Sequence, residues 1–516
     1  MEEEKELSGI LGNIVRSSFL VFFSVILSKA FSYIYKIIIA RNFGPEVYGL
    51  FSLGLVVIGI AGAIASFGVS DGILRYVSFY RGRKEYGKIK FITKKSMHFL
   101  FVTSIIITII VFYLADFISI SFFHDVNLSY YLKFLSLALP FSIIGGAMLA
   151  IIRGFEKITA YSFLVNFLHN FLKVILLCVA ILIGLGHKGV LLSYVMAYLL
   201  LTFSTYFFII KYIKKDYYLA KEITLSSKKE VTREFTSYSW PVVFSSILFN
   251  LFLWIDTIVL GSSGGGAQSV GIYGAAITLA GLFSFAQDLF IQLFVPLVSR
   301  NLSINNNKII QEVSKQVFKW VFIINLGIAL LLIIFPGTVL NLFFGSEYIG
   351  ASQALRTLSI GAIFSGFLGL LIGLMNVAGK TKKMFGYYII FSSINLFLDV
   401  LLVKYYGING VAFGTAVTWI LFTITLFRQV KKEYGFYPLR RAIIKVAFSG
   451  LTAGSLLWLV GKLVAPSISF MIISALSFGI VYILMIFLTK SLDFRDLEII
   501  RKLKNKIFGD KDTNSL

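Results

Sequence analysis

The stretch GPEVYGLF, at residues 44–51, decides the fold because a similar stretch returns later in the chain. It opens a long apolar run that ends in a basic loop at Arg75, and GAQSVGIY, at residues 266–273, opens another that ends at Arg300. The two copies are offset by 222 residues at their second glycines and by 225 at the arginines. The chain therefore reads as one unit written twice.

Two further landmarks recur at nearly the same spacing. Residues 153–157 (RGFEK) separate two apolar runs, as residues 376–380 (NVAGK) do later, and the glycine–valine pair at 189–190 returns at 410–411. Repeated halves with a binding site between them are a common plan for secondary transporters. The repeat thus predicts a transporter.

Composition places the chain in a membrane. Hydrophobic residues make up 58% of the 516 positions, charged residues 14%, and the mean hydropathy is +0.86. A helix needs about 20 apolar residues to cross a bilayer, whereas the strands of a membrane barrel alternate and are half as long. Fourteen apolar runs have the helical length, near residues 14–37, 47–69, 97–115, 130–152, 160–184, 189–211, 237–260, 270–298, 317–335, 353–377, 385–405, 410–428, 442–463 and 468–489.

We therefore expect an all-α integral membrane protein with about 14 transmembrane helices. Residues 1–234 are predicted to form an N-terminal six-helix lobe with a cytoplasmic linker. Residues 235–434 are predicted to form a second, pseudo-symmetric six-helix lobe. Residues 435–516 would add two transmembrane helices and a cytoplasmic tail.

The formal net charge of +23 lies almost wholly in alternate loops, for example after the second, sixth, tenth and twelfth runs. Under the positive-inside rule both termini are cytoplasmic. This charge favours membrane topology and contact with anionic lipids over a nucleic-acid partner. The acidic start, residues 1–6, is unlike a secretory signal, so the first helix should be retained. Cys178 stands alone and allows no internal disulfide.

Polar groups within the first helix are the strongest hint of a binding site. Ser24, Ser28, Lys29, Ser32, Tyr33 and Lys36 are spaced by three and four residues and share one helical face. Lys29 is in mid-span, where an ammonium facing lipid costs several kcal/mol, so this face should meet a water-filled cavity or a carboxylate. Lys36 lies nearer the end and has the alternative of snorkelling to the interface.

Other intramembrane polar groups continue the pattern. Two alternatives remain open for them: polar contacts that hold helices together, or groups that line a cavity. The carboxylates would act as counter-ions for the basic residues or as ion-coupling groups. The basic residues are Lys173 and Arg356, the acidic ones are Asp256, Asp288 and Asp399, and His169, Asn170, Asn250, Gln287, Gln292 and Asn395 are neutral or weakly basic.

No enzyme chemistry stands out. The four histidines have no metal-ligand spacing, and neither a Walker sequence nor GxSxG is present. We expect neither an enzyme nor a bound cofactor. Transport energy would come from an ion gradient, the membrane potential, a downhill substrate or another protein.

The segment ARNFGPEVYGLF, at residues 40–51, followed by SFGVS at 66–70, resembles the polysaccharide-biosynthesis (Wzx-like) flippases of the MOP superfamily. Residues 240–261 and 270–273 resemble the seventh and eighth helices of the same family. This resemblance implies a MATE-like fold with two lobes around a central cavity, alternating access, and transfer of a lipid-linked oligosaccharide for cell-surface glycan assembly. The carrier would be a polyprenyl or dolichyl phosphate or diphosphate in the cytoplasmic membrane.

The resemblance also implies a cationic cavity that holds the carrier phosphate. Lys29, Tyr33, Lys36, Lys173 and Arg356 are the predicted substrate-binding residues. Membrane lipids, the glycolipid, a coupling proton or sodium ion and envelope glycan-assembly proteins are the expected partners. Related flippases often use arginine in the first helix, and lysine lacks its bidentate fork.

Two alternatives stay open. A MATE-type drug or cation antiporter would be driven by protons or sodium; many carry a carboxylate in the first helix, which residues 14–37 lack, although Asp256 in the seventh would serve. A scaffold of an envelope-assembly complex that transports nothing is the other.

Overall fold

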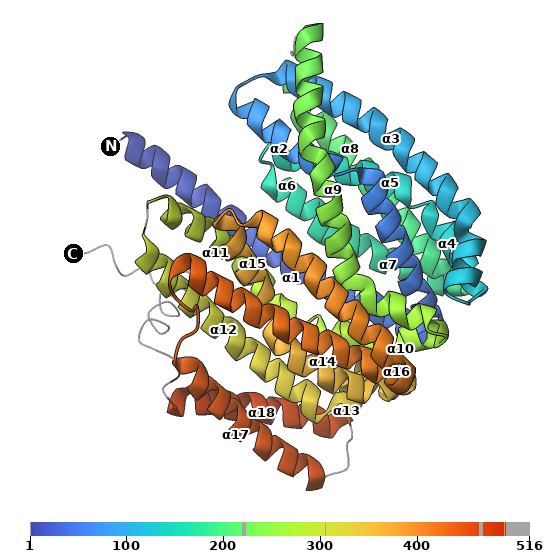
Figure 1. Ribbon diagram of the computed structural model, residues 1–516, viewed down its shortest axis with the longest axis vertical. Coiled ribbons are helices and arrows are strands. Elements are labelled where there is room, and N and C mark those ends of the chain that lie inside the picture. Colours follow the sequence, from blue (N-terminus) through green and yellow to red (C-terminus); the bar gives the residue numbers. More distant parts are fainter. Residues whose placement is uncertain (1, 219–222, 305, 464–467, 490, 492–516) are drawn as a thin grey trace. The chain divides into compact units, whose positions relative to one another are not determined.

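The computed structural model describes residues 2–218, 223–304, 306–463, 468–489 and 491, and within these ranges every regular element is a helix (Figure 1). The predicted all-α class is confirmed. Lys221 and the predicted cytoplasmic tail at 492–516 lie outside the described residues. In chain order the elements are α1 (Glu2–Ser66), α2 (Val69–Gly82), α3 (Tyr86–Phe117), η1 (Ile118–Phe122), α4 (Asn127–Ser136), α5 (Leu139–Gly154), α6 (Ile158–Ser162), η2 (Phe163–Leu168), α7 (His169–Leu182), α8 (Gly186–Tyr218), α9 (Leu225–Ser262), α10 (Gly266–Ala280), α11 (Phe283–Ser303), α12 (Asn307–Ile334), α13 (Pro336–Phe343), η3 (Ser346–Ala351), α14 (Ser352–Ser365), α15 (Leu368–Val377), α16 (Thr381–Tyr434), α17 (Ala442–Leu463) and α18 (Ile468–Leu488).

The number of spans agrees with the sequence once long helices are divided. In the described part of the chain, eight helices are long and apolar enough to cross a membrane, or up to ten if each of two bent pairs is one span. The apolar part of α1 has 43 residues, roughly 65 Å and about twice the thickness of a bilayer core. Dividing α1 and α16, and counting the shorter apolar helices Asn250–Ser262 and Ser477–Leu488, gives the fourteen predicted spans.

The divisions in α1 and α16 fall at glycines. Gly44 has φ 77° and Gly407 has φ 52°, backbone angles that only glycine adopts without strain. Pro45 follows directly after Gly44 and removes a helical hydrogen bond at the same point. Each long helix is therefore two spans joined without a loop.

The predicted basic loop at Arg75 is wrong. The second span breaks at Phe67 (φ 45°) and Gly68 (φ 63°), and the chain then continues as the helix α2, which contains Arg75. Val69, Ile73, Val77 and Tyr80 form the buried face of α2. Because this apolar face recurs at helical spacing, packing holds the basic segment in a helix.

Several spans are bent or interrupted where the sequence has breakers. The pair α4 and α5 bends by 41°, with Pro140 in the first turn of α5, and the pair α10 and α11 bends by 46°. The predicted interruptions at 153–157 and 376–380 are confirmed, because α5 ends at Gly154 and α15 ends at Val377.

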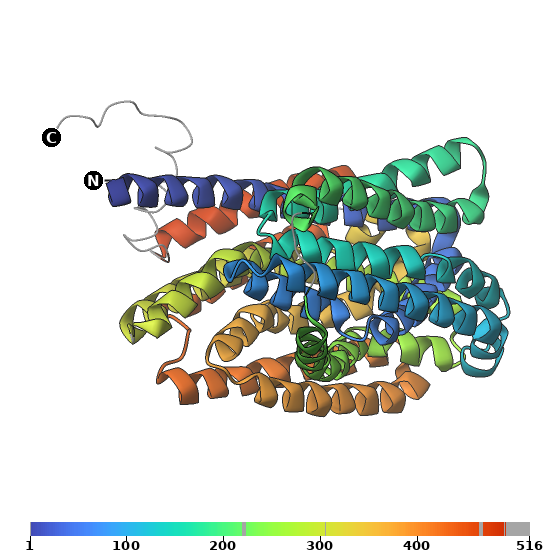
Figure 2. The same ribbon diagram turned by 90° about the horizontal axis from the view of Figure 1, so that it is seen from above.

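The chain divides into two compact units, each described by itself. Unit 1 comprises Met1–Thr278, Phe343–Ala351 and Phe385–Thr415, and unit 2 comprises Leu279–Leu342, Ser352–Met384 and Ala416–Leu516. In unit 2, α17 and α18 pack side by side and against α12 (Figures 1 and 2). The boundaries predicted from the repeat, at 234 and 434, stay a prediction.

Within unit 1 the two repeated stretches touch each other. A Cβ atom added to Gly49 in α1 would overlap the carbonyl oxygen of Ala267 in α10, and one added to Gly271 would overlap the carbonyl oxygen of Pro45. The two helices therefore cross with their backbones in contact, as small residues permit in membrane helices.

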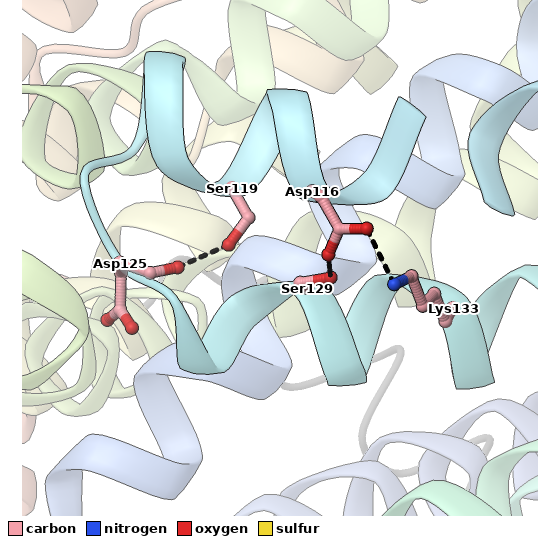
Figure 3. A network of polar contacts seen from close by, with 5 residues as sticks. All are labelled: Asp116, Ser119, Asp125, Ser129 and Lys133. Carbon is pink, nitrogen blue, oxygen red and sulfur yellow. Dashed lines mark hydrogen bonds and ion pairs between the residues drawn. The ribbon is translucent and has the colours of Figure 1, made fainter. Parts of the chain in front are cut away.

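A polar network holds the hairpin between α3 and α4 (Figure 3). Asp116 accepts hydrogen bonds from Ser129 and from Lys133, whose Nζ lies 2.7 Å from Oδ2. Ser119 donates to the backbone oxygen of Asp125. These contacts satisfy the polar groups at the helix ends and fix the turn.

Candidate functional site

Three of the predicted basic residues belong to unit 1. Lys29 and Lys36 lie on α1 together with Tyr33, and Lys173 lies on α7; all four side chains are half-buried. The helix α1 packs against both α7 and the π-helix η2 that precedes it. The contact between these elements brings the first-helix face next to Lys173.

Lys36 is the centre of this group. Its Nζ donates to Thr278 Oγ1 on α10 at 3.4 Å, and it lies within electrostatic range of both Lys29 and Lys173. The hydroxyl of Tyr48 lies 3.0 Å from the same Thr278 oxygen. We call Lys29, Lys36 and Lys173 the cationic cluster.

Tyrosine and serine side chains surround the cationic cluster. The Nζ of Lys173 lies 5.8 Å from the ring centroid of Tyr35, which permits a cation–π contact. The hydroxyl of Tyr35 donates to the backbone oxygen of Val190 at 3.2 Å and lies 3.0 Å from Ser193 Oγ. Because α8 holds its hydroxyl, the Tyr35 ring is fixed beside the ammonium group.

His169 and Asn170 extend the polar surface along α7. Asn170 Nδ2 donates to Ser28 Oγ on α1 at 3.0 Å, so it ties the two helices together as a polar helix contact would. The ring of His169 lies 4.5 Å from that of Tyr198, and its Nδ1 is buried without a hydrogen-bond partner among the described residues. A buried polar atom of this kind is costly unless something else binds there.

Two members of the cationic cluster have no carboxylate partner among the described residues. Among the residues that the structure describes, neither Lys36 nor Lys173 forms an ion pair. Positive charges held near one another inside a membrane need an anion nearby to offset the cost of desolvation. The arrangement therefore suits an anionic ligand.

Two predicted carboxylates form a second site in the same unit. Asn395 Nδ2 donates to Asp256 Oδ1 at 3.3 Å and to Asp399 Oδ2 at 2.5 Å, and Tyr273 donates to Asp256 Oδ2 at 2.6 Å. Asp256 is 6% exposed and Asp399 is fully buried. We call Asp256 and Asp399 the carboxylate pair.

The roles predicted for the carboxylate pair, counter-ions or ion-coupling groups, stay predictions. The hydrogen-bond donors described for the pair are Asn395 and Tyr273. Asp399 Oδ1 and the Thr415 hydroxyl are buried beside Asp256 in the same part of the structure. Two adjacent carboxylates cannot both stay charged in a dry site unless a cation joins them. Their oxygens and the Thr415 hydroxyl are hard ligands that fit a proton or a small cation.

The remaining predicted residues belong to unit 2. Arg356 on α14 is exposed, and its Nε donates to the backbone oxygen of Ile333 near the end of α12 at 3.1 Å. Asp288 on α11 is half-buried. Their predicted roles stay predictions.

Sequence reasoning missed several neutral residues at the two sites. Tyr35 borders the cationic cluster and contacts Ser193, Tyr198 contacts His169, and Tyr273 and Thr278 on α10 each contact one of the two sites. The four-residue spacing of Tyr194 and Tyr198 on α8 was an available signal, because it places two tyrosines on one helical face. Thr278 carried no such signal.

The sequence matches the models of two known protein families. The sequence model of a family described as polysaccharide biosynthesis protein matches residues 14–302, more than half of the chain. A second model, described as MatE, matches residues 241–401.

Two relatives and one solved structure illustrate the likeness. An uncharacterized membrane protein of Methanocaldococcus jannaschii is 27% identical over 436 residues, covering 82% of this chain and 99% of the relative. A provisionally named O-antigen transporter of Shigella flexneri is 23% identical over 400 residues, covering 75% of this chain and 90% of the relative. The structure of the lipid II flippase MurJ in an inward closed conformation is 17% identical, with a TM-score of 0.70 over 94% of this chain and 99% of that one. The last likeness shows the fold.

Proposed function

This chain belongs to the polysaccharide biosynthesis protein family of multi-pass membrane transporters, and from that membership we propose that it moves a lipid-linked oligosaccharide across the membrane by alternating access. The carrier would be a polyprenyl or dolichyl phosphate or diphosphate. The membrane would be the cytoplasmic membrane, with both termini on the cytoplasmic side and envelope glycan-assembly proteins nearby.

The cationic cluster is the observation that carries this proposal. Lys36 lies within electrostatic range of Lys29 and Lys173, and neither Lys36 nor Lys173 pairs with a described carboxylate. Phosphoryl oxygens bind strongly to ammonium groups where water is scarce. The half-buried surfaces of these lysines suit a ligand that enters and leaves.

The use of lysine shapes the selectivity of the site. An ammonium group is a point charge without the planar fork of arginine, so it reads phosphate by charge more than by geometry. The cluster would therefore accept carriers that differ in headgroup geometry while rejecting organic cations, which like charges repel.

The carboxylate pair supplies a place for the coupling ion. A proton or sodium ion between Asp256 and Asp399 would offset their mutual repulsion, and Asn395 and Tyr273 would orient the two carboxylates. Ion binding there would favour one conformation of the transporter over another, because a ligand shifts an equilibrium by its differential affinity.

A reconstituted vesicle assay tests the proposal. Purified protein should translocate a lipid-linked oligosaccharide, and Lys29→Ala should abolish that activity while the protein stays folded. Lys188→Ala, at an exposed position on α8, is the matched control and should transport normally. Wild-type transport by Lys29→Ala would refute the role of the cluster, and absence of glycolipid transport by the unaltered protein would refute the function.

A MATE-type cation antiporter is the second candidate, favoured by the MatE match at 241–401 and by the buried carboxylate pair. The same vesicles distinguish it. Proton- or sodium-coupled efflux of an organic cation, without movement of the glycolipid, would replace the first proposal by the second.

A further inference from the structure

A separate hollow lies between α2, α3 and α9, all within unit 1. It has a volume of about 200 Å³, and its wall is mostly apolar, with Phe67, Phe99, Phe235 and Trp240 among the lining residues. Phe67 stacks on Trp240 with ring centroids 6.3 Å apart and meets Phe99 edge-on at 5.7 Å. No residue of the cationic cluster or the carboxylate pair contributes to this wall.

Two large apolar side chains in the wall of the hollow are exposed. Phe99 on α3 is 41% exposed and Trp240 on α9 is 57% exposed, although both belong to a wall of large apolar side chains. Tryptophan side chains of membrane proteins are enriched at the membrane–water interface, where their rings contact lipid. A hydrocarbon chain is thus the natural occupant of the apolar wall.

Cations border the same hollow. Lys95 donates to Thr232 Oγ1 at 3.0 Å, which bridges α3 to α9, and its Nζ lies 5.7 Å from the Phe91 ring. Lys228 on α9 lies 5.9 Å from the same ring. Two ammonium groups therefore gather at the Phe91 end, where the predicted topology places the cytoplasmic surface.

A buried hydroxyl inside the hollow has no partner. Ser239 is 4% exposed, lines the hollow, and its Oγ makes no hydrogen bond with any residue that the structure describes. Gly72 on α2 packs against this oxygen so closely that a Cβ atom would overlap it. A buried unsatisfied hydroxyl costs about 1–3 kcal/mol, which a ligand oxygen would recover.

We propose that this hollow binds an anionic membrane phospholipid, at a site distinct from the transported glycolipid. The phosphate lies at Lys95 and Lys228, one hydrocarbon chain lies against Phe67, Phe99 and Trp240, and an oxygen of the glycerol linkage accepts from Ser239. Charge favours an anionic lipid over a neutral one, because Lys95 lines the hollow and Lys228 lies near the same Phe91 ring.

Such a lipid would stabilise a weak point of the fold. The hollow borders the break between α1 and α2, where Phe67 (φ 45°) adopts a conformation that costs non-glycine residues free energy. A lipid that contacts Phe67 and spans α3 and α9 stabilises the state with this geometry, because binding to one state favours that state.

Trp240 provides the probe for a test. In a variant that keeps Trp240 and carries phenylalanine at the other four tryptophans, phospholipids with brominated chains should quench the fluorescence. Brominated phosphatidylglycerol should quench saturably and at a several-fold lower mole fraction than brominated phosphatidylcholine. Lys95→Ala in this background should remove the difference between the lipids, whereas Lys94→Ala, at the exposed neighbouring position, should keep it.

Two outcomes would overturn the proposal: equal quenching by both lipids, which indicates a general lipid shell, and unchanged selectivity in Lys95→Ala. If the single-tryptophan variant does not fold, native mass spectrometry of the otherwise unaltered chain replaces it. The chain should retain one anionic lipid through delipidation, Lys95→Ala should lose it and Lys94→Ala should retain it. Equal retention by all three proteins would contradict the site.

Discussion

The cationic cluster and the carboxylate pair are opposite in charge and in access, although both belong to the same compact unit. Lys29, Lys36 and Lys173 are half-buried, whereas Asp256 is 6% exposed and Asp399 is fully buried. Lys36 contacts the Thr278 hydroxyl and Lys173 lies over the Tyr35 ring, while the two carboxylates share the amide of Asn395.

This difference indicates the size of each ligand. Under the proposed function, the half-buried cluster would bind a large anion and the buried carboxylate pair would take a proton or a small cation. The helix α10 contacts both sites, because Tyr273 bonds Asp256 and Thr278 accepts from Lys36. We infer that α10 couples the two sites, so that binding at one changes the affinity at the other.

The largest expected effect comes from removing charge from the cationic cluster. Lys36→Ala combined with Lys173→Ala should lower glycolipid flipping by at least about 100-fold, because two charge-assisted contacts of about 1.5 kcal/mol or more are lost. Initial flipping rates in vesicles measure the effect. Flipping activity within threefold of that of the unaltered protein would show that the cationic cluster does not bind the glycolipid.

The next effect tests the position of α10. Gly271→Ala should destabilise the protein by about 2 kcal/mol, because its methyl group overlaps the Pro45 carbonyl oxygen and the helices must separate. Thermal unfolding in detergent measures it. Gly146→Ala is the matched control, since a Cβ atom at Gly146 meets open space and should leave the melting temperature unchanged or higher. Equal melting temperatures for the two variants would show that α1 and α10 do not pack in backbone contact at this crossing.

The third prediction tests the carboxylate pair by neutralising Asp399. Asp399→Asn should reduce the dependence of flipping on a proton or sodium gradient by roughly tenfold, equivalent to about 1.4 kcal/mol, while glycolipid binding stays unchanged. Flipping measured with and without each gradient gives the result. Asp116→Asn, in the network of Figure 3, should keep full gradient dependence. A loss of glycolipid binding in Asp399→Asn would show that the carboxylate pair and the cationic cluster bind the same ligand.

The smallest effect concerns the contact between Lys36 and α10. Thr278→Val should reduce flipping by about fivefold, because the hydroxyl that Lys36 and Tyr48 contact is lost while the shape remains and one hydrogen bond contributes about 1 kcal/mol. Thr425→Val removes a hydroxyl that bonds only within its own helix and should have no effect. Equal rates in both variants would remove Thr278 from the link.

Apolar periodicity predicted the fold well because membrane helices must satisfy their backbone groups internally. The interruptions at 153–157 and 376–380 could also be predicted, because glycine and charged residues occur together there. The helix at Arg75 was not readable from charge alone, because its apolar face appears only when Ile73, Val77 and Tyr80 are placed on one side.

The charged residues of the candidate sites could be predicted from the sequence, and most of their neutral neighbours could not. A lysine in mid-span is rare enough to be noticed, so Lys29, Lys36 and Lys173 could be predicted one by one. Their neutral neighbours could not, because Tyr35 and Ser193 are 158 residues apart and only packing brings them together. The pairing of Asp256 with Asp399, across 143 positions, likewise depends on the contact between helices.

The glycine crossing also bears on how this chain arose. Pro45 precedes Ala267 by the 222 positions that separate Gly49 from Gly271, and each glycine touches the counterpart of the residue that the other touches. A contact that maps onto itself in this way has the symmetry of an isologous homodimer. A half-length ancestor pairing through this surface would have had to satisfy one sequence twice. Under the predicted duplication, fusion of the two copies would remove that requirement, and Pro45 and Ala267 would differ while both keep a carbonyl oxygen at the same point of the crossing.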